Sequence, residues 1–158
     1  MEQLLVLGAL NSERQLTTLG KQMALFPLEP RYAKVLIKSR ELNCANEVII
    51  IVAMLSSENI FFTPGRVANQ HGDDDFNPVK ELDAAKKTFT SSYGDHMLLY
   101  NVYNAYRQSG EDKQWCIDNL INWRSMKRVE EVRLQLIEYW NSLNWPLKQF
   151  YDADEQGL

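Results

Sequence analysis

The sequence from residue 16 to residue 30 reads LTTLGKQMALFPLEP, and it carries the clearest local signals in the chain. A threonine at its start can cap a helix, because its hydroxyl accepts a hydrogen bond from a free N–H of the first turn. The apolar residues that recur at helical spacing after it are Leu19, Met23 and Phe26. Pro27 and Pro30 end this helix and begin the next, since proline suits a first helical turn and not an interior one. We therefore expect a rigid joint between two helices here.

Apolar periodicity and punctuation indicate helices along the rest of the chain. Seven Gly and five Pro fall between the apolar segments, which is typical of a helical protein. The further helices that we expect cover residues 2–10, 31–42, 48–55, 79–90, 95–106, 115–123 and 124–140. The apolar run from Val48 to Leu55 could also form a strand, but no neighbouring segment alternates in a way that would pair with it. We predict an all-α bundle of six to eight helices, with at most one short β-hairpin near residues 11–16.

Caps and buried stripes follow from the same patterns. Asn46 can cap the helix of residues 48–55, and Asp95 can cap the helix that follows a tight turn at Gly94. The stripe expected on the helix from residue 31 consists of Tyr32, Val35, Leu36 and Leu42. The stripe expected on the last helix consists of Met126, Val129, Val132, Leu136 and Trp140.

Composition narrows the class of protein. The 158 residues allow one ordinary domain or two small ones, and 17 basic against 21 acidic residues give a formal charge of −4. That balance argues against a generally basic nucleic-acid binder, but it allows one small basic face. Cys44 and Cys116 form no CxxC pair, which fits a reducing compartment. The longest apolar run has eight residues, and the N-terminus does not resemble a signal peptide, so we expect a soluble intracellular protein.

Motifs for catalysis or metal binding are missing from the sequence. It contains no phosphate-binding loop, GxGxxG turn, GxSxG elbow, HExxH pair or zinc-type cysteine pairing. His71 with the triple Asp of residues 73–75 comes nearest to a metal site, but such an acidic, glycine-flanked loop is usually solvated, so we expect no metal there. Cys116, beside Trp115, is expected to be a buried small hydrophobe. The chain is therefore interpreted as a non-catalytic module.

Three segments together resemble a known family. They are the string of residues 16–30, the sequence GDHMLLYNVY of residues 94–103, and a third group formed by Trp115-Cys116, Asn122, Arg124-Ser125-Met126 and VRLQL at residues 132–136. Their order and spacing resemble the helicase-associated region of DEAH-box RNA helicases. That family includes helicases of mRNA splicing and of ribosome biogenesis. The resemblance covers residues 2 to about 140.

The resemblance implies a domain organisation. Residues 1–30 would be the C-terminal part of a winged-helix domain, residues 31–143 a helical-bundle ratchet domain, and residues 144–158 a tail. In the resembling full-length proteins, two RecA-like motor domains bind ATP and Mg²⁺, and an OB-fold domain follows the ratchet. This chain would hold no cofactor and would not be an enzyme by itself. A nuclear or nucleolar location is implied, with the cytoplasm as an alternative.

The resemblance also implies a role in RNA binding, since the ratchet forms one wall of a single-stranded RNA channel with contacts mainly to the backbone. The candidate RNA-binding residues are Asn122, Arg124, Ser125, Lys127, Arg128 and His96. A helix N-terminus offers free N–H groups to phosphate, and the three basic side chains of residues 124–128 share one face. The alternative is a solvated basic patch neutralised by Glu130 and Glu131.

The other candidates are expected to be structural. They are Pro27 and Pro30 at the joint, Gly94 and Asp95 at a helix start, and Trp115 in the core. Trp123, Trp140 and Tyr103 are also expected to lie in the core rather than to stack on bases. The rival function is a protein-interaction module that docks G-patch-type or other regulators and binds little RNA.

Overall fold

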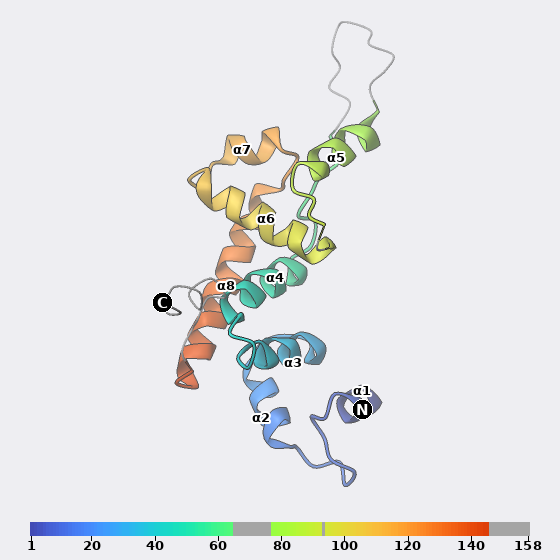
Figure 1. Ribbon diagram of the computed structural model, residues 1–158, viewed down its shortest axis with the longest axis vertical. Helices are drawn as coiled ribbons and strands as arrows, with labels where there is room; N and C mark the ends of the chain where they lie inside the picture. The colour runs from blue at the N-terminus through green and yellow to red at the C-terminus, as the bar shows by residue number, and fades with distance from the viewer. Residues whose placement is uncertain (65–76, 93, 146–158) are drawn as a thin grey trace, which may run out of the picture. The chain divides into compact units, whose positions relative to one another are not determined.

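The computed structural model describes residues 1–64, 77–92 and 94–145 (Figure 1). Within these ranges it has eight α-helices. They are α1 (Glu2–Val6), α2 (Thr18–Leu25), α3 (Pro30–Ser39), α4 (Ala45–Ser56), α5 (Pro78–Lys87), α6 (Asp95–Gln108), α7 (Lys113–Asp118) and α8 (Trp123–Ser142). Two isolated β-bridges, Leu10 with Leu16 and Phe61 with Ile121, are the only extended pairings among the described residues. The expected all-α fold is confirmed, and so is helix rather than strand for residues 48–55.

The joint predicted from residues 16–30 is present. Thr17 is the N-cap of α2, and its hydroxyl oxygen accepts a hydrogen bond from the Gly20 N–H at 3.0 Å. The same hydroxyl lies 2.6 Å from the carbonyl oxygen of Gly8, to which it can donate, so it ties the start of α2 to the preceding turn. Helix α2 ends before Pro27, and Pro30 is the first residue of α3.

The chain divides into two compact units. One consists of Met1–Ser56 together with the chain from Glu131 onward, and the other of Ser57–Glu130. In the first unit α2 packs against α3 and α3 against α4 (Figure 1). Its core cluster consists of Ala9, Met23, Phe26, Ala33, Leu36, Ile37, Ala45, Ile49, Val52, Leu136 and Trp140. This division does not follow the expected domain boundary at residue 30, which stays a prediction.

Helix α3 buries a different stripe from the one that its sequence suggested. Ala33, Leu36 and Ile37 are buried, whereas Val35 is 53% exposed. At 3.6 residues per turn, Val35 lies about 150° around the helix from the centre of that buried face. Leu42 is 69% exposed, because α3 ends at Ser39 and leaves it outside the helix. The expected burial of Val35 and Leu42 was therefore wrong.

Two predicted caps are also corrected. Asn46 lies inside α4, which begins at Ala45, because the Cys44 carbonyl already accepts a hydrogen bond from the Val48 N–H. Asp95 is the first residue of α6, and Gly94 takes the N-cap position with φ 104°, a conformation that residues with a Cβ rarely adopt. Two caps were missed: the side-chain oxygen of Asn77 accepts from the backbone of the first turn of α5, and that of Asp112 accepts from the Gln114 N–H in α7.

The stripe predicted for the last helix is confirmed. Met126, Val129, Leu136 and Trp140 of α8 are fully buried. Val132 is half-buried and packs against the core cluster of the first unit. Since the division between the units falls at residue 130, the first turns of α8 belong to the second unit and the rest to the first.

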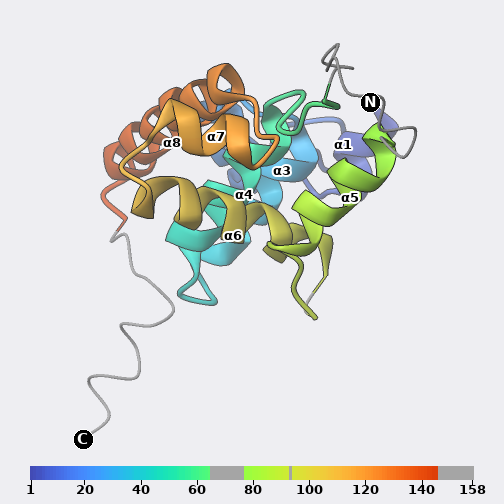
Figure 2. The same ribbon diagram turned by 90° about the horizontal axis from the view of Figure 1, so that it is seen from above.

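Aromatic rings pack in the second unit, where α6 and α7 lie side by side in both views (Figure 2). Trp115 of α7 meets Phe89 edge-on, with ring centroids 6.0 Å apart, and Tyr106 of α6 at 6.4 Å. The neighbouring Cys116 is fully buried, as expected, and burial raises the pKa of its thiol to about 11, with a smaller contribution from Asp112. This thiol is therefore protonated and unreactive near neutral pH.

Truncation of Leu36 and of Val35 in turn should show which face of α3 is buried. We expect Leu36→Ala to lower the free energy of unfolding by about 2–5 kcal/mol, because it leaves a cavity in the core cluster. Val35→Ala should change it by less than about 0.5 kcal/mol. Urea unfolding followed by circular dichroism measures both. Equal losses for the two variants would contradict the orientation of α3.

Gly20 should tolerate no side chain, although it lies within α2. A Cβ built there would lie 2.1 Å from the carbonyl oxygen of Ala9, which is backbone and cannot move aside cheaply. We expect Gly20→Ala to destabilise the protein by about 1–3 kcal/mol through overpacking. This outweighs the gain of about 1 kcal/mol in helix propensity. Thermal unfolding checks the result, with Lys21→Ala on the same helix as control. A raised melting temperature for Gly20→Ala would show that the backbones are not in close approach.

Candidate nucleic-acid interface

The start of α8 is anchored to a segment some sixty residues earlier in the chain. The Asn122 N–H donates to the Ile60 carbonyl at 2.7 Å, and the Phe62 N–H donates to the Leu120 carbonyl at 3.0 Å. The bridge between Phe61 and Ile121 lies between these two hydrogen bonds. This short pairing fixes where α8 begins.

Ser125 adds a side-chain bond to the same anchor. Its hydroxyl lies 2.9 Å from the carbonyl oxygen of Glu58 and 3.1 Å from that of Asn59, and its hydrogen is shared between these two acceptors. A hydroxyl has one hydrogen, so this donor is already engaged within the second unit. The structure thus gives Ser125 a positioning contact, whereas the sequence had placed it among the RNA contacts.

The basic candidates project from the anchored helix start. Arg124, Lys127 and Arg128 are all exposed within the first two turns of α8. The first turn of α8 has no acidic residue, although acidic side chains there would stabilise the helix dipole. Within the described ranges Arg124 has no ion pair. The positive potential of the helix end therefore adds to that of the Arg124 side chain.

Glu130, which the alternative interpretation expected to neutralise these charges, also faces α6. Its carboxylate accepts a hydrogen bond from the Tyr103 hydroxyl at 2.8 Å and lies 3.9 Å from the Arg107 guanidinium. Arg107 pairs with Glu111 as well, and this hydrogen bond is the main cause of its raised pKa. The acidic groups of Glu111 and Glu130 thus share one arginine of α6.

Two lysine ammonium groups lie over the ring of Trp123, the first residue of α8. The Lys127 ammonium lies 4.0 Å from its ring centroid, and the Lys113 ammonium, from the first residue of α7, lies 5.2 Å away. Each such contact is worth about 0.5–1 kcal/mol at exposed sites. Sequence reasoning missed Lys113, since ten residues and a change of helix separate it from Trp123. Trp123 itself is half-buried, so the expectation that it lies in the core is met only in part.

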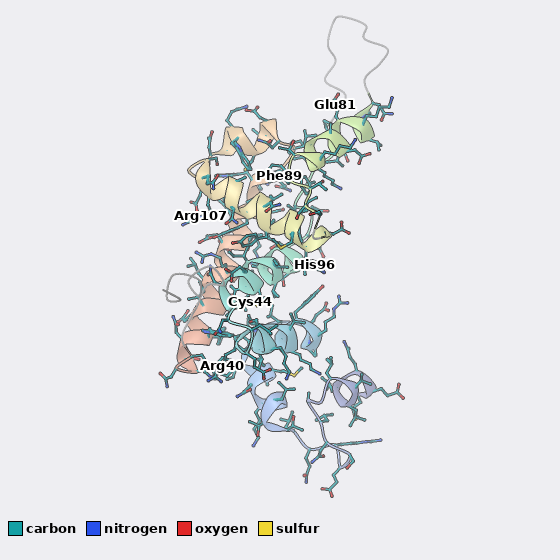
Figure 3. All side chains as sticks on the ribbon, in the orientation of Figure 1. Arg40, Cys44, Glu81, Phe89, His96 and Arg107 are labelled. Carbon is teal, nitrogen blue, oxygen red and sulfur yellow. The ribbon has the colours of Figure 1, made fainter. Side chains whose placement is uncertain are left out.

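His96 lies apart from this group in the chain. It is exposed at the second position of α6, near one end of a helix whose other end carries Arg107 (Figure 3). Among the residues that the structure describes, no hydrogen bond or ring contact joins His96 to the start of α8. Its predicted contact with RNA stays a prediction.

The residues expected to be structural lie at helix ends or in an aromatic cluster. Pro27 lies between α2 and α3, Pro30 opens α3, and Gly94 and Asp95 stand at the start of α6. Trp115 is half-buried in the aromatic cluster with Phe89 and Tyr106.

Residues 1–64, 77–92 and 94–145 contain no cluster of three or more His, Cys, Asp or Glu side chains that could hold an ion. His71 and residues 73–75, the nearest approach to a metal site in the sequence, lie outside the described residues. No helix in the described part of the chain is long and apolar enough to span a bilayer.

Removal of the Ser125 hydroxyl should affect stability rather than RNA affinity. We expect Ser125→Ala to lower the free energy of unfolding by about 0.5–1.5 kcal/mol, because the hydrogen bond that its one hydroxyl hydrogen makes to these carbonyl oxygens is lost. Ser142→Ala is the control, since among the described residues Ser142 bonds to the Tyr139 carbonyl of its own helix and to no other group. Urea unfolding and an RNA titration of the folded protein separate the two effects. Weaker RNA binding with unchanged stability would restore Ser125 as a direct contact.

Comparison with known proteins agrees with this architecture. The model "Helicase associated domain (HA2), winged-helix" matches residues 1–28, and the model "Helicase associated domain (HA2), ratchet-like" matches residues 29–99. The chain is 39% identical over 138 residues to the "Probable ATP-dependent RNA helicase DHX35 homolog" of Caenorhabditis elegans. That alignment covers 87% of this chain and 17% of the relative's length. The expected resemblance is confirmed: this chain belongs to the helicase-associated (HA2) family, with a winged-helix segment followed by a ratchet-like segment.

Proposed function

We propose that this chain is a non-catalytic region of a DEAH-box RNA helicase that forms one wall of a single-stranded RNA channel. The observation that carries the proposal is the exposed basic group of Arg124, Lys127 and Arg128 on an anchored helix start. An anchored group can resist the force of a moving strand, whereas the same side chains on a loose segment would follow it.

The chemistry suits the RNA backbone rather than the bases. Lysine and arginine neutralise phosphates regardless of sequence, and the free N–H groups at a helix start add further donors. A translocating enzyme needs such sequence-independent contacts, because every nucleotide must pass through the same site. The net charge of −4 does not conflict with this role, since the basic side chains are concentrated on one helix start.

The motor function would belong to the rest of the parent protein. The relative from Caenorhabditis elegans is about six times as long as the matching region, and its name states an ATP-dependent RNA helicase activity. RecA-like motor domains that bind ATP and Mg²⁺, together with an OB-fold domain, are therefore the proposed partners of this chain. The proposal extends to a nuclear role in mRNA splicing or ribosome biogenesis.

Loss of two arginines should weaken RNA binding by the chain. We expect Arg124→Ala combined with Arg128→Ala to weaken binding of a labelled oligouridylate about tenfold at low salt. Each lost phosphate contact should also lower the slope of log affinity against log salt by about 0.7. Fluorescence anisotropy at several salt concentrations measures both quantities.

The control carries the same loss of charge on another helix of the second unit. Lys80→Ala combined with Lys87→Ala removes two exposed lysines of α5 and should leave the affinity and its salt dependence unchanged. Negligible RNA binding by the unchanged chain would contradict the proposal that it forms one wall of an RNA channel. That result would favour the alternative, a module that docks regulatory proteins. ATP hydrolysis by the purified chain would overturn the assignment of the motor to other domains.

A further inference from the structure

Two lysines from different helices meet at one aromatic ring in the second unit. Lys113 opens α7 and Lys127 lies in the second turn of α8, and both ammonium groups approach Trp123. Because both distances run to the same ring centroid, the two nitrogens lie within about 9 Å of each other. That is roughly one Debye length at physiological ionic strength, so salt does not fully screen the two charges and both can attract the same anion.

The acidic groups beside Lys113 in the chain make hydrogen bonds to other residues. Asp112 caps α7 by accepting from the Gln114 N–H, and Asp118 accepts from the Gln114 side-chain amide. Neither Lys113 nor Lys127 has an ion pair with any residue in the described ranges. Two like charges near one ring, neither of them in such an ion pair, favour the binding of an anion beside them.

We propose that Lys113, Trp123 and Lys127 form a clasp for a backbone phosphate of single-stranded RNA; this inference rests on the proposed function above. The Trp123 ring holds the two flexible side chains in place before RNA arrives. Less conformational freedom is then lost on binding, which makes each contact more effective. The hydrogens of each ammonium group that point away from the ring remain available to phosphate oxygens.

The geometry favours phosphate over a stacked base. The Lys127 ammonium, 4.0 Å from the ring centroid, covers a face of the Trp123 ring that a base would need. The indole Nε1 is buried and has no acceptor among the described residues, so it is not presented as a donor to RNA. The charged ends of the lysines are thus the groups that this site offers.

Lys113 provides the test, because it is exposed and was not part of the basic group on α8. We expect Lys113→Gln in the 158-residue chain to weaken oligouridylate binding about threefold to tenfold at low salt. The slope of log affinity against log salt should fall by about 0.7, as for the loss of one phosphate contact. The matched control, Lys80→Gln on α5, should reproduce the unchanged chain in both quantities. Circular dichroism confirms that each variant is folded.

A second readout follows the ring directly. The Trp123 indole N–H resonance, assigned by its loss in Trp123→Phe, should shift on addition of oligouridylate and shift less in Lys113→Gln. If the chain binds RNA and Lys113→Gln behaves like Lys80→Gln, the clasp is wrong and the proposed function survives. If the chain binds no RNA, both fail. If polyglutamate binds as tightly as oligouridylate and loses affinity equally in Lys113→Gln, the clasp recognises acidic protein segments instead.

Discussion

Burial of one stripe on α8 is the constraint on which the rest of this structure depends. Met126 and Val129 supply side chains to the second unit, and Leu136 and Trp140 lie in the core cluster of the first. Each fully buried side chain of this size contributes about 1.5–3 kcal/mol. Rotation of α8 would expose the stripe, so the burial fixes which residues of the helix face solvent.

The exposed basic residues follow from that constraint. With the stripe buried, Arg124, Lys127 and Arg128 must lie on the solvent side of the first two turns. The pairing of residues 60–62 with residues 120–122 then sets the point at which the helix begins. The buried stripe and the pairing at the start of α8 therefore together determine where the basic side chains lie. The stability of the fold is in this way linked to the proposed contact with RNA.

Local signals predicted the helices well where the sequence contains strong stops. Thr17, Pro27 and Pro30 placed both ends of α2 and the start of α3 correctly, because capping and the missing N–H of proline act within a few residues. Asn46 and Asp95 failed as caps because a side chain suited to capping is also accepted inside the first turn. Val35 failed because an apolar residue marks a buried face only when the partner of that helix is known.

The sequence alone determined the all-α class, the membership of the helicase-associated family and the presence of basic residues at the start of the last helix. These depend on periodicity, on short motifs and on composition, which are all local in the chain. Only the tertiary structure decided that Ser125 holds carbonyls of Glu58 and Asn59, and that Lys113 shares a ring with Lys127. Such contacts join residues far apart in the sequence or on different helices, and their partners are set by packing, which no local pattern encodes.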